Sequence, residues 1–210
     1  VDLGGRRIIK KKKKKQYKDK IFNEKEVDEL VLFDISASEE KKRPNLDFIH
    51  DIATECFMPI CYGGGINNLE DAQQLFRLGI EKISINSAGI QDHNFIKQLS
   101  EKFGKSSIVV TIDAKKDLFG NYYVYRERGK KSTGMRVDMW AEEVEHLGAG
   151  EIIINNIDRD GVMEGYDIKL LKNISRNAHI PIVACGGAGK IVPSSVHWII
   201  IQPHGNRIHI

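Results

Sequence analysis

The sequence predicts an α/β fold, a (β/α)8 TIM barrel with a two-fold half-barrel repeat that is incomplete at both ends. Two observations favour this fold. Short runs rich in β-branched residues alternate with longer polar stretches of helical spacing, and two sequence landmarks recur at a single offset. A chain of 210 residues fits one large core. We therefore expect residues 1–210 to form a single (β/α)-barrel domain.

The candidate strands are nearly continuous in apolar residues, as is typical of parallel strands buried on both faces. They cover residues 30–36, 59–62, 82–86, 108–113, 152–156 and 180–185. Two stretches between them, 68–78 and 140–147, have apolar residues at three- and four-residue spacing, which predicts amphipathic helices. Residues 121–134 are β-prone and contain turn residues, so we expect a small hairpin inserted after the strand that ends at Asp113.

An internal repeat predicts the closed barrel. Glu29 and Glu151 each open an apolar strand, and Pro59 and Pro181 each precede a strand that ends in a glycine cluster. Both pairs are 122 positions apart, which indicates a duplicated half of about four β-α units. Two halves of that length need more residues than the 210 present, so some segment is expected to be missing.

Composition excludes several classes of protein. Hydrophobic residues make up 41% of the chain and charged residues 29%, and no apolar run is long enough for a membrane span. No secretory signal is visible, so we expect a cytoplasmic protein. The net charge of +3 comes largely from the lysine run at 10–15, which is more typical of a solvated segment than of a nucleic-acid surface. Cys56, Cys61 and Cys185 are interpreted as reduced and buried.

Glycine clusters follow two of the strands, at 63–65 and 186–189. Glycine lets the backbone approach an anion, and free amide hydrogens at a helix start bind phosphate oxygens. One equivalent site in each half predicts a ligand with a phosphate at each end. A single cluster could equally be a tight turn that serves packing alone.

Carboxylates and amides close the remaining strands. Asp34, Asp113 and the pair Asp158 and Asp160 lie at strand ends, where the active site of such a barrel is found. They could divide acid and base work, or serve as helix caps and ion-pair partners. For Asp113 catalysis is favoured. None of the seven histidines falls at such a strand end, so we expect chemistry that uses carboxylates without a metal or cofactor.

In order along the chain, the motifs resemble those of the cyclase subunit of imidazole glycerol phosphate synthase. They are DELVLFDISAS (28–38), YGGGI (62–66), KISINSA (82–88), VVTIDAK (109–115), GAGEI (148–152), IDRDG (157–161) and ACGGAG (184–189). The ordered match covers about residues 24–190. The resemblance implies a lyase of histidine biosynthesis. This enzyme uses ammonia from a separate glutaminase subunit to convert a bisphosphorylated ribulosyl-aminoimidazole into imidazole glycerol phosphate and aminoimidazole carboxamide ribotide.

The resemblance also implies residue roles. Asp113 is similar to the family's general acid, and Asp2 to its general base if residues 1–3 end the first strand. One phosphate would be held by Gly64, Gly65, Asn86 and Ser87, and the other end of the ligand by Asp160, Gly161, Gly186 and Gly187. Three of the four charged residues that gate the ammonia channel are matched by Glu29, Lys82 and Glu151.

The chain departs from the family pattern in three places. We expect it to begin within the first strand. It has a lysine run between residues 6 and 20 where the family has a loop and the start of a helix, and residues 190–210 do not resemble the last helices and eighth strand. Two alternatives stay open. A paralogue group supplies ammonia chemistry for surface sugars, which segments 21–27 and 55–59 favour. The chain could also be a phosphate-binding scaffold for a glutaminase that catalyses nothing.

Overall fold

The chain folds as a parallel-stranded α/β barrel wall with its helices on the outside. A computed structural model describes residues 6–10, 28–34, 37, 42–127, 129–188 and 200–201. Its strands are β1 (Arg6–Lys10), β2 (Glu29–Phe33), β3 (Ile60–Gly63), β4 (Lys82–Ile85), β5 (Ile108–Lys116), β6 (Tyr122–Arg126), β7 (Lys131–Arg136), β8 (Glu151–Asn156), β9 (Ile182–Cys185) and β10 (Ile200–Ile201). Its helices are α3 (Leu46–Glu55), α4 (Leu69–Arg77), α5 (Ser87–Gln91), α6 (His93–Phe103), α7 (Val137–His146) and α8 (Ile168–Ile174), with short 3-10 turns η1 (Lys105–Ser107) and η2 (Ile157–Arg159).

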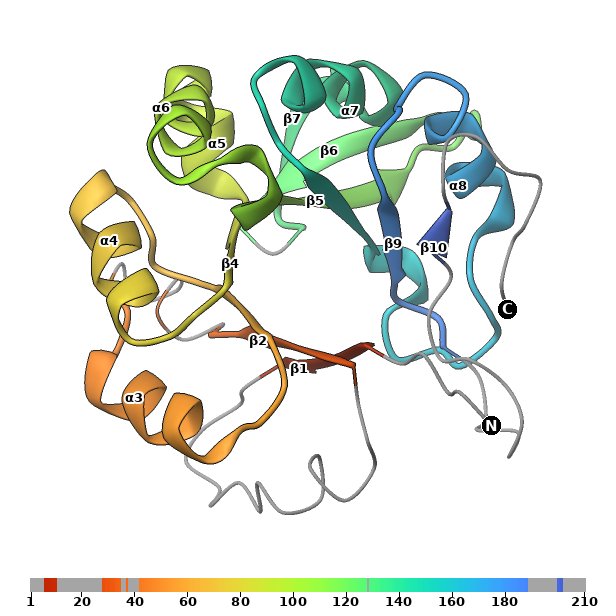
Figure 1. The fold of residues 1–210 in the computed structure, drawn as a ribbon. Helices are drawn as coiled ribbons and strands as arrows, with labels where there is room; N and C mark the ends of the chain where they lie inside the picture. Colours follow the sequence, from red (N-terminus) through yellow and green to blue (C-terminus); the bar gives the residue numbers. More distant parts are fainter. Residues whose placement is uncertain are drawn as a thin grey trace.

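Seven parallel strands run side by side in the order β1-β2-β3-β4-β5-β8-β9. Successive strands from β2 onward are joined through helices that lie outside the sheet, while the strands curve around a common axis (Figure 1). This is the alternation that the sequence predicts. Parallel strands place all their carboxyl ends at one edge, so the residues that close each strand meet at one mouth.

Two differences from the predicted arrangement concern the ends of the wall. The strand beside β2 is Arg6–Lys10, within the segment where the family has a loop, and residues 1–3, the possible end of the first strand, lie outside the described residues. At the other edge β10 pairs antiparallel to β9, whereas a regular eighth strand would be parallel. The rest of the lysine run, beyond Lys10, lies outside the described residues.

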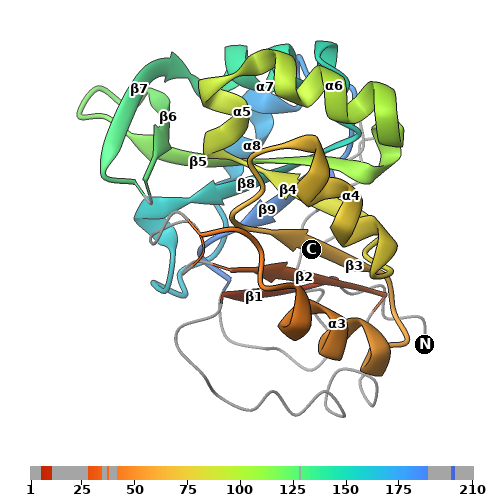
Figure 2. The same ribbon diagram turned by 90° about the vertical axis from the view of Figure 1, so that its left-hand side faces the viewer.

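The predicted hairpin is present as β6 and β7. It changes the extent of the preceding strand, because β6 pairs antiparallel with residues 113–116 of β5. The strand therefore continues to Lys116 instead of ending at Asp113. Figure 2 shows the hairpin projecting beyond the barrel wall on the side where β5 ends.

Alternation along the strands divides the core into two layers. The larger layer packs outward-facing strand residues such as Ile83 and Ile112 against helix residues such as Leu75, Leu99 and Trp140. A smaller cluster of Val31, Cys61, Val109, Ile153, Val183 and Cys185 fills the concave side. The reason is the period of two in a strand, which sends successive side chains to opposite faces.

The half-barrel repeat is visible in the backbone. Leu30 N donates to Pro59 O, and Ile152 N donates to Pro181 O, both at 2.9 Å. The two bonds are related by the same 122-residue offset that the sequence shows. In each half, the bond aligns the start of one strand with the start of the next. The ends of β2 and β3 therefore correspond in space to the ends of β8 and β9.

Two expectations from the composition concern the burial of the cysteines and the presence of a membrane-spanning helix. Cys61 and Cys185 are buried, as predicted, whereas Cys56 is only half-buried. Among the described residues, no helix is both long and apolar enough to cross a membrane.

Candidate active site

Asp113 lies at the mouth of the barrel, on β5 between two asparagines. Its side chain is almost buried, with 9% of its surface exposed. Asn86, which follows β4, donates from Nδ2 to Asp113 Oδ2 at 3.0 Å, and Asn155 of β8 donates from Nδ2 to Asp113 Oδ1 at 2.6 Å. Asn86 was predicted to hold a phosphate, but in this structure its amide contacts the carboxylate. Its buried Oδ1 has no hydrogen-bond partner within the described part of the chain.

The two predicted glycine turns are built alike. A side chain at Gly64 would place its Cβ 2.4 Å from Asp34 O, and one at Gly186 would place it 2.5 Å from Asn156 O. At Gly65 and Gly187 the corresponding distances, to the carbonyl oxygens of Lys42 and Gly165, are 2.4 Å and 2.3 Å. All four glycines have positive φ. The turns therefore need glycine for close backbone packing, and the carboxyl ends of parallel strands put both on one face.

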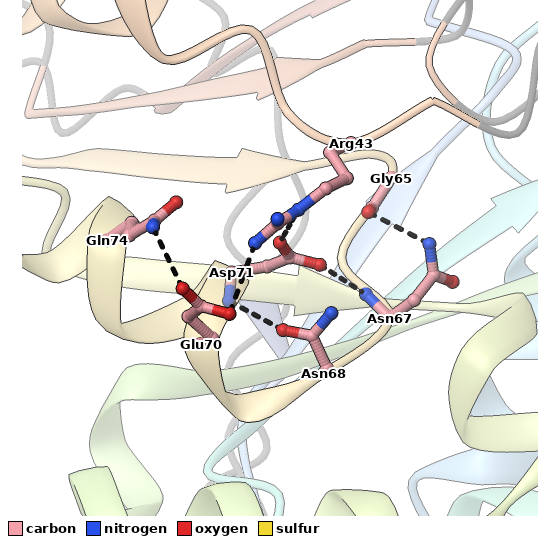
Figure 3. A network of polar contacts seen from close by, with 7 residues as sticks. All are labelled: Arg43, Gly65, Asn67, Asn68, Glu70, Asp71 and Gln74. Carbon is pink, nitrogen blue, oxygen red and sulfur yellow. Dashed lines mark hydrogen bonds and ion pairs between the residues drawn. The ribbon is translucent and has the colours of Figure 1, made fainter.

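A polar network anchors the first turn (Figure 3). Arg43 Nε donates to Asp71 Oδ1 at 2.6 Å, and Asp71 Oδ2 accepts from Asn67 N at 3.3 Å. Asn67 Nδ2 in turn donates to Gly65 O at 3.0 Å. Asp71, on α4, is almost fully buried, and its charge and hydrogen bond raise the pKa of the Arg43 guanidinium. The network ties the β3–α4 turn to the segment before α3.

We expect Asp71→Ala to destabilise the protein by about 2–3 kcal/mol, because it removes a buried acceptor of two hydrogen bonds, one of them from a charged group. Urea unfolding followed by circular dichroism measures the change. Glu70→Ala is the matched control: Glu70 neighbours Asp71 but is exposed, so its loss should change stability by less than about 0.5 kcal/mol. Equal losses for the two variants would contradict the anchoring role of Asp71.

The second turn is held by different residues. Arg159 Nη1 donates to Gly165 O at 2.9 Å, and Gly165 N donates to Gly187 O at 2.7 Å. Nearby, Tyr122 of the hairpin donates its hydroxyl to Asp167 Oδ2 at 2.7 Å, which fastens β6 to the start of α8. Burial and this hydrogen bond raise the pKa of Tyr122.

The remaining predicted carboxylates have different surroundings. Asp34 is buried after β2, where Oδ1 accepts from Ala37 N at 3.2 Å. Its charge, together with burial, raises the pKa of Tyr62. Asp158 is exposed, and its Oδ2 accepts from Lys116 N at 2.9 Å, so it ties η2 to the end of β5. Asp160 is exposed as well.

Two predicted ligand-binding positions have little around them. A Cβ at Gly161 would meet nothing within 4 Å, so this glycine makes no close approach such as those of the two turns. Ser87 is the first residue of α5 and is half-buried at the mouth. Their assignment to phosphate binding stays a prediction.

At the opposite end of the barrel the three predicted gate residues meet. Lys82 Nζ lies 3.1 Å from Glu29 Oε1 and 3.1 Å from Glu151 Oε2. The three residues open β4, β2 and β8, which are not adjacent strands, so their side chains meet across the concave interior. Between this triad and Asp113 lie the inner apolar cluster and a hydroxyl pair, Ser84 Oγ and Thr111 Oγ1, 2.6 Å apart.

One predicted site residue is not placed and one contact was missed. Asp2 lies outside the described residues, so its role stays a prediction. Asn155 was not predicted, although it lies directly opposite Asp113 in the ladder of β5 and β8. Only the register of these two strands, which are 42 positions apart, could have identified it.

Comparison with known proteins places this geometry in a family. Residues 8–192 match the family described as Histidine biosynthesis protein. The hisF2 protein of Pseudomonas aeruginosa is 50% identical over 172 residues, which are 82% of this chain and 68% of that protein. The imidazole glycerol phosphate synthase subunit HisF of Chlorobaculum tepidum is 44% identical over 172 residues, with the same coverage.

A third relative gives the same result. The imidazole glycerol phosphate synthase subunit HisF of Sulfolobus acidocaldarius is 42% identical over 170 residues, which are 81% of this chain and 68% of that protein. The match spans every described strand from β2 to β9. The chain belongs to the histidine biosynthesis protein family.

Proposed function

We propose that this protein is a lyase, the cyclase subunit of an imidazole glycerol phosphate synthase. It would convert a bisphosphorylated ribulosyl-aminoimidazole and ammonia into imidazole glycerol phosphate and aminoimidazole carboxamide ribotide. The observation that carries the proposal is the pair of equivalent glycine turns on one edge of the sheet, with Asp113 between them on β5. A ligand with a phosphate at each end would span the two turns, and its reacting centre would then lie over the carboxylate.

The chemistry follows from this placement. Ammonia attacks the ketose carbonyl and gives an imine, and the ring then closes as the C–N bond to the leaving carboxamide ribotide breaks. Each stage moves protons between nitrogen and oxygen atoms, which a positioned carboxylate can accept and return. Holding the ligand at both ends keeps the reacting atoms close together, which is the larger part of such catalysis.

The direct test is a cyclase assay with the bisphosphorylated ribulosyl substrate and an ammonium salt. We expect imidazole glycerol phosphate and aminoimidazole carboxamide ribotide in equal amounts. Binding of the substrate without either product would favour a non-catalytic scaffold and overturn the proposal.

A glutaminase subunit is the proposed partner, docked over the end of the barrel that carries Glu29, Lys82 and Glu151. Ammonia has to cross from that end to the mouth without meeting solvent, and the barrel axis is the short covered route. We infer that the ion triad closes this route, because Lys82 bridges both glutamates. Ammonia supplied in solution can reach the mouth directly and does not need the triad.

Lys82→Met should therefore separate the two ammonia sources. With the glutaminase and glutamine we expect turnover to fall on the order of tenfold, since the gate loses its cation and leaves two carboxylates uncompensated. With saturating ammonium salt, turnover should stay within about twofold of the wild type. Lys97→Met, which changes an exposed lysine of α6, is the control and should alter neither rate. Equal losses with both sources would contradict a gating role.

A second candidate is ammonia-dependent amidination of a surface sugar. The segments 21–27 and 55–59 favour considering it. Both activities would use the same barrel and the same ammonia route. The cyclase assay separates them, because a sugar-modifying protein would leave the ribulosyl substrate unchanged.

A further inference from the structure

The carboxylate of Asp113 accepts hydrogen bonds from two side chains, one on each side of β5. Asp113 faces Asn155 directly in the parallel ladder of β5 and β8, and Asn86 follows β4 on the other side of β5. Both carboxylate oxygens are engaged, one by each amide, at 3.0 Å and 2.6 Å. Rotating the carboxylate about its Cβ–Cγ bond would break both hydrogen bonds together. Its plane is therefore fixed by residues that come from two other strands.

The direction of these bonds follows from the groups involved. An ionised carboxylate only accepts hydrogen bonds, so each amide has to present its NH2 group to Asp113 and turn its oxygen away. Hydrogen bonds donated to a carboxylate stabilise the charged form. Asp113 therefore begins as a proton acceptor, and it can donate only a proton that it has first taken up.

We propose that Asn155 is a positioning residue for Asp113, with Asn86 as its counterpart on the opposite side. This inference rests on the proposed cyclase function. Asn155 acts through Asp113, because its hydrogen bond sets the direction in which the carboxylate faces the ligand. The proton that Asp113 accepts from the attacking nitrogen is the one it returns to the leaving nitrogen, so the carboxylate ends each turnover in the charge state in which it began.

Kinetics of the wild type and three variants test this role with ammonium salt as the nitrogen source. Asn155→Leu keeps the approximate shape but removes the donor, and kcat should fall about 100-fold with KM changed less than about threefold, because a misdirected catalytic group affects the transition state more than binding. Asn155→Thr restores a hydroxyl donor and should recover at least about tenfold of that loss. Asn177→Leu, at an exposed asparagine beyond α8, is the control and should leave both constants unchanged.

Coupling to Asp113 distinguishes positioning from a general loss of structure. Asn155→Leu should cost nothing further in an Asp113→Asn background, because residues that act as one unit are not additive. Additive losses in the double variant, a rise in KM with kcat unchanged, or equal activity of Asn155→Leu and wild type would each overturn the inference. Circular dichroism and thermal unfolding confirm that the compared variants are folded.

A measurement that does not need turnover keeps this inference separate from the proposed function. The side-chain amide of Asn155 gives a 1H–15N signal that is assigned by its loss in Asn155→Leu. It should move upfield in Asp113→Leu, where the charged acceptor is gone. If wild type makes no product but this shift is seen, the proposed function fails while the contact stands. If wild type is active and the signal does not move, the positioning role is wrong.

Discussion

Asp113→Asn should reduce kcat of the cyclase reaction about 1,000-fold while leaving the fold intact, since acid–base groups contribute roughly 100- to 10,000-fold. The substitution is nearly isosteric and removes only the ability to take up and return a proton. It also places a third amide between those of Asn86 and Asn155, so one hydrogen bond in the group becomes unfavourable. Steady-state kinetics with the bisphosphorylated substrate and ammonium salt measure the effect.

The control for this variant is Asp138→Asn. Asp138 also loses a charge on substitution, but it lies at the start of α7 and pairs with Arg136 outside the barrel. Its kcat should stay within about twofold of the wild type, because it contacts no proposed ligand group. Comparable turnover by Asp113→Asn and Asp138→Asn would remove the proton-transfer role from Asp113.

Gly186→Ala should cause a large loss of stability at the mouth, about 2–5 kcal/mol. Two costs combine: left-handed backbone with a Cβ costs roughly 1–2 kcal/mol, and overpacking against a rigid neighbour costs roughly 1–3 kcal/mol. The neighbour here is the carbonyl of Asn156, 2.5 Å from the new Cβ, which belongs to a strand and cannot move aside easily. Binding of the bisphosphate ligand should weaken as well.

Gly79→Ala provides a matched comparison. Its φ of 90° is close to the 88° of Gly186, but a Cβ there would meet nothing within 4 Å. Only the backbone cost remains, so we expect a loss of about 1–2 kcal/mol. The difference between the two variants in chemical denaturation isolates the steric contribution. If both lose the same stability, the glycine at 186 is required for its conformation alone.

The sequence is sufficient to place most strands, because a strand buried on both faces leaves a continuous apolar run. Its limits are clearest where a strand has polar neighbours. Arg6–Lys10 forms β1 although charged residues surround two isoleucines, and no periodic pattern marks it. Likewise β5 extends to Lys116 because the hairpin supplies a partner, which is a tertiary effect and not a property of residues 114–116.

The same distinction applies to the site. Asp113 and the glycine turns could be predicted because each closes a strand, and position relative to a strand end is a local property. The hydrogen bond from Asn155 to Asp113 could not be predicted, since it depends on which residues of β5 and β8 lie opposite each other. The triad at the other end required a further step, the resemblance to a family, because Glu29, Lys82 and Glu151 meet only when three separated strands curve around one axis.

The small inner cluster lies between the two ends of the barrel. Val109 stands on β5 with Asp113, and Ile153 stands on β8 with Glu151 and Asn155. A shift of β8 along the barrel axis would therefore displace Glu151 of the ion triad and Asn155, the hydrogen-bond partner of Asp113, by the same amount. Through this one strand, a movement at the ion triad would reach the hydrogen-bond partner of the proton-handling group.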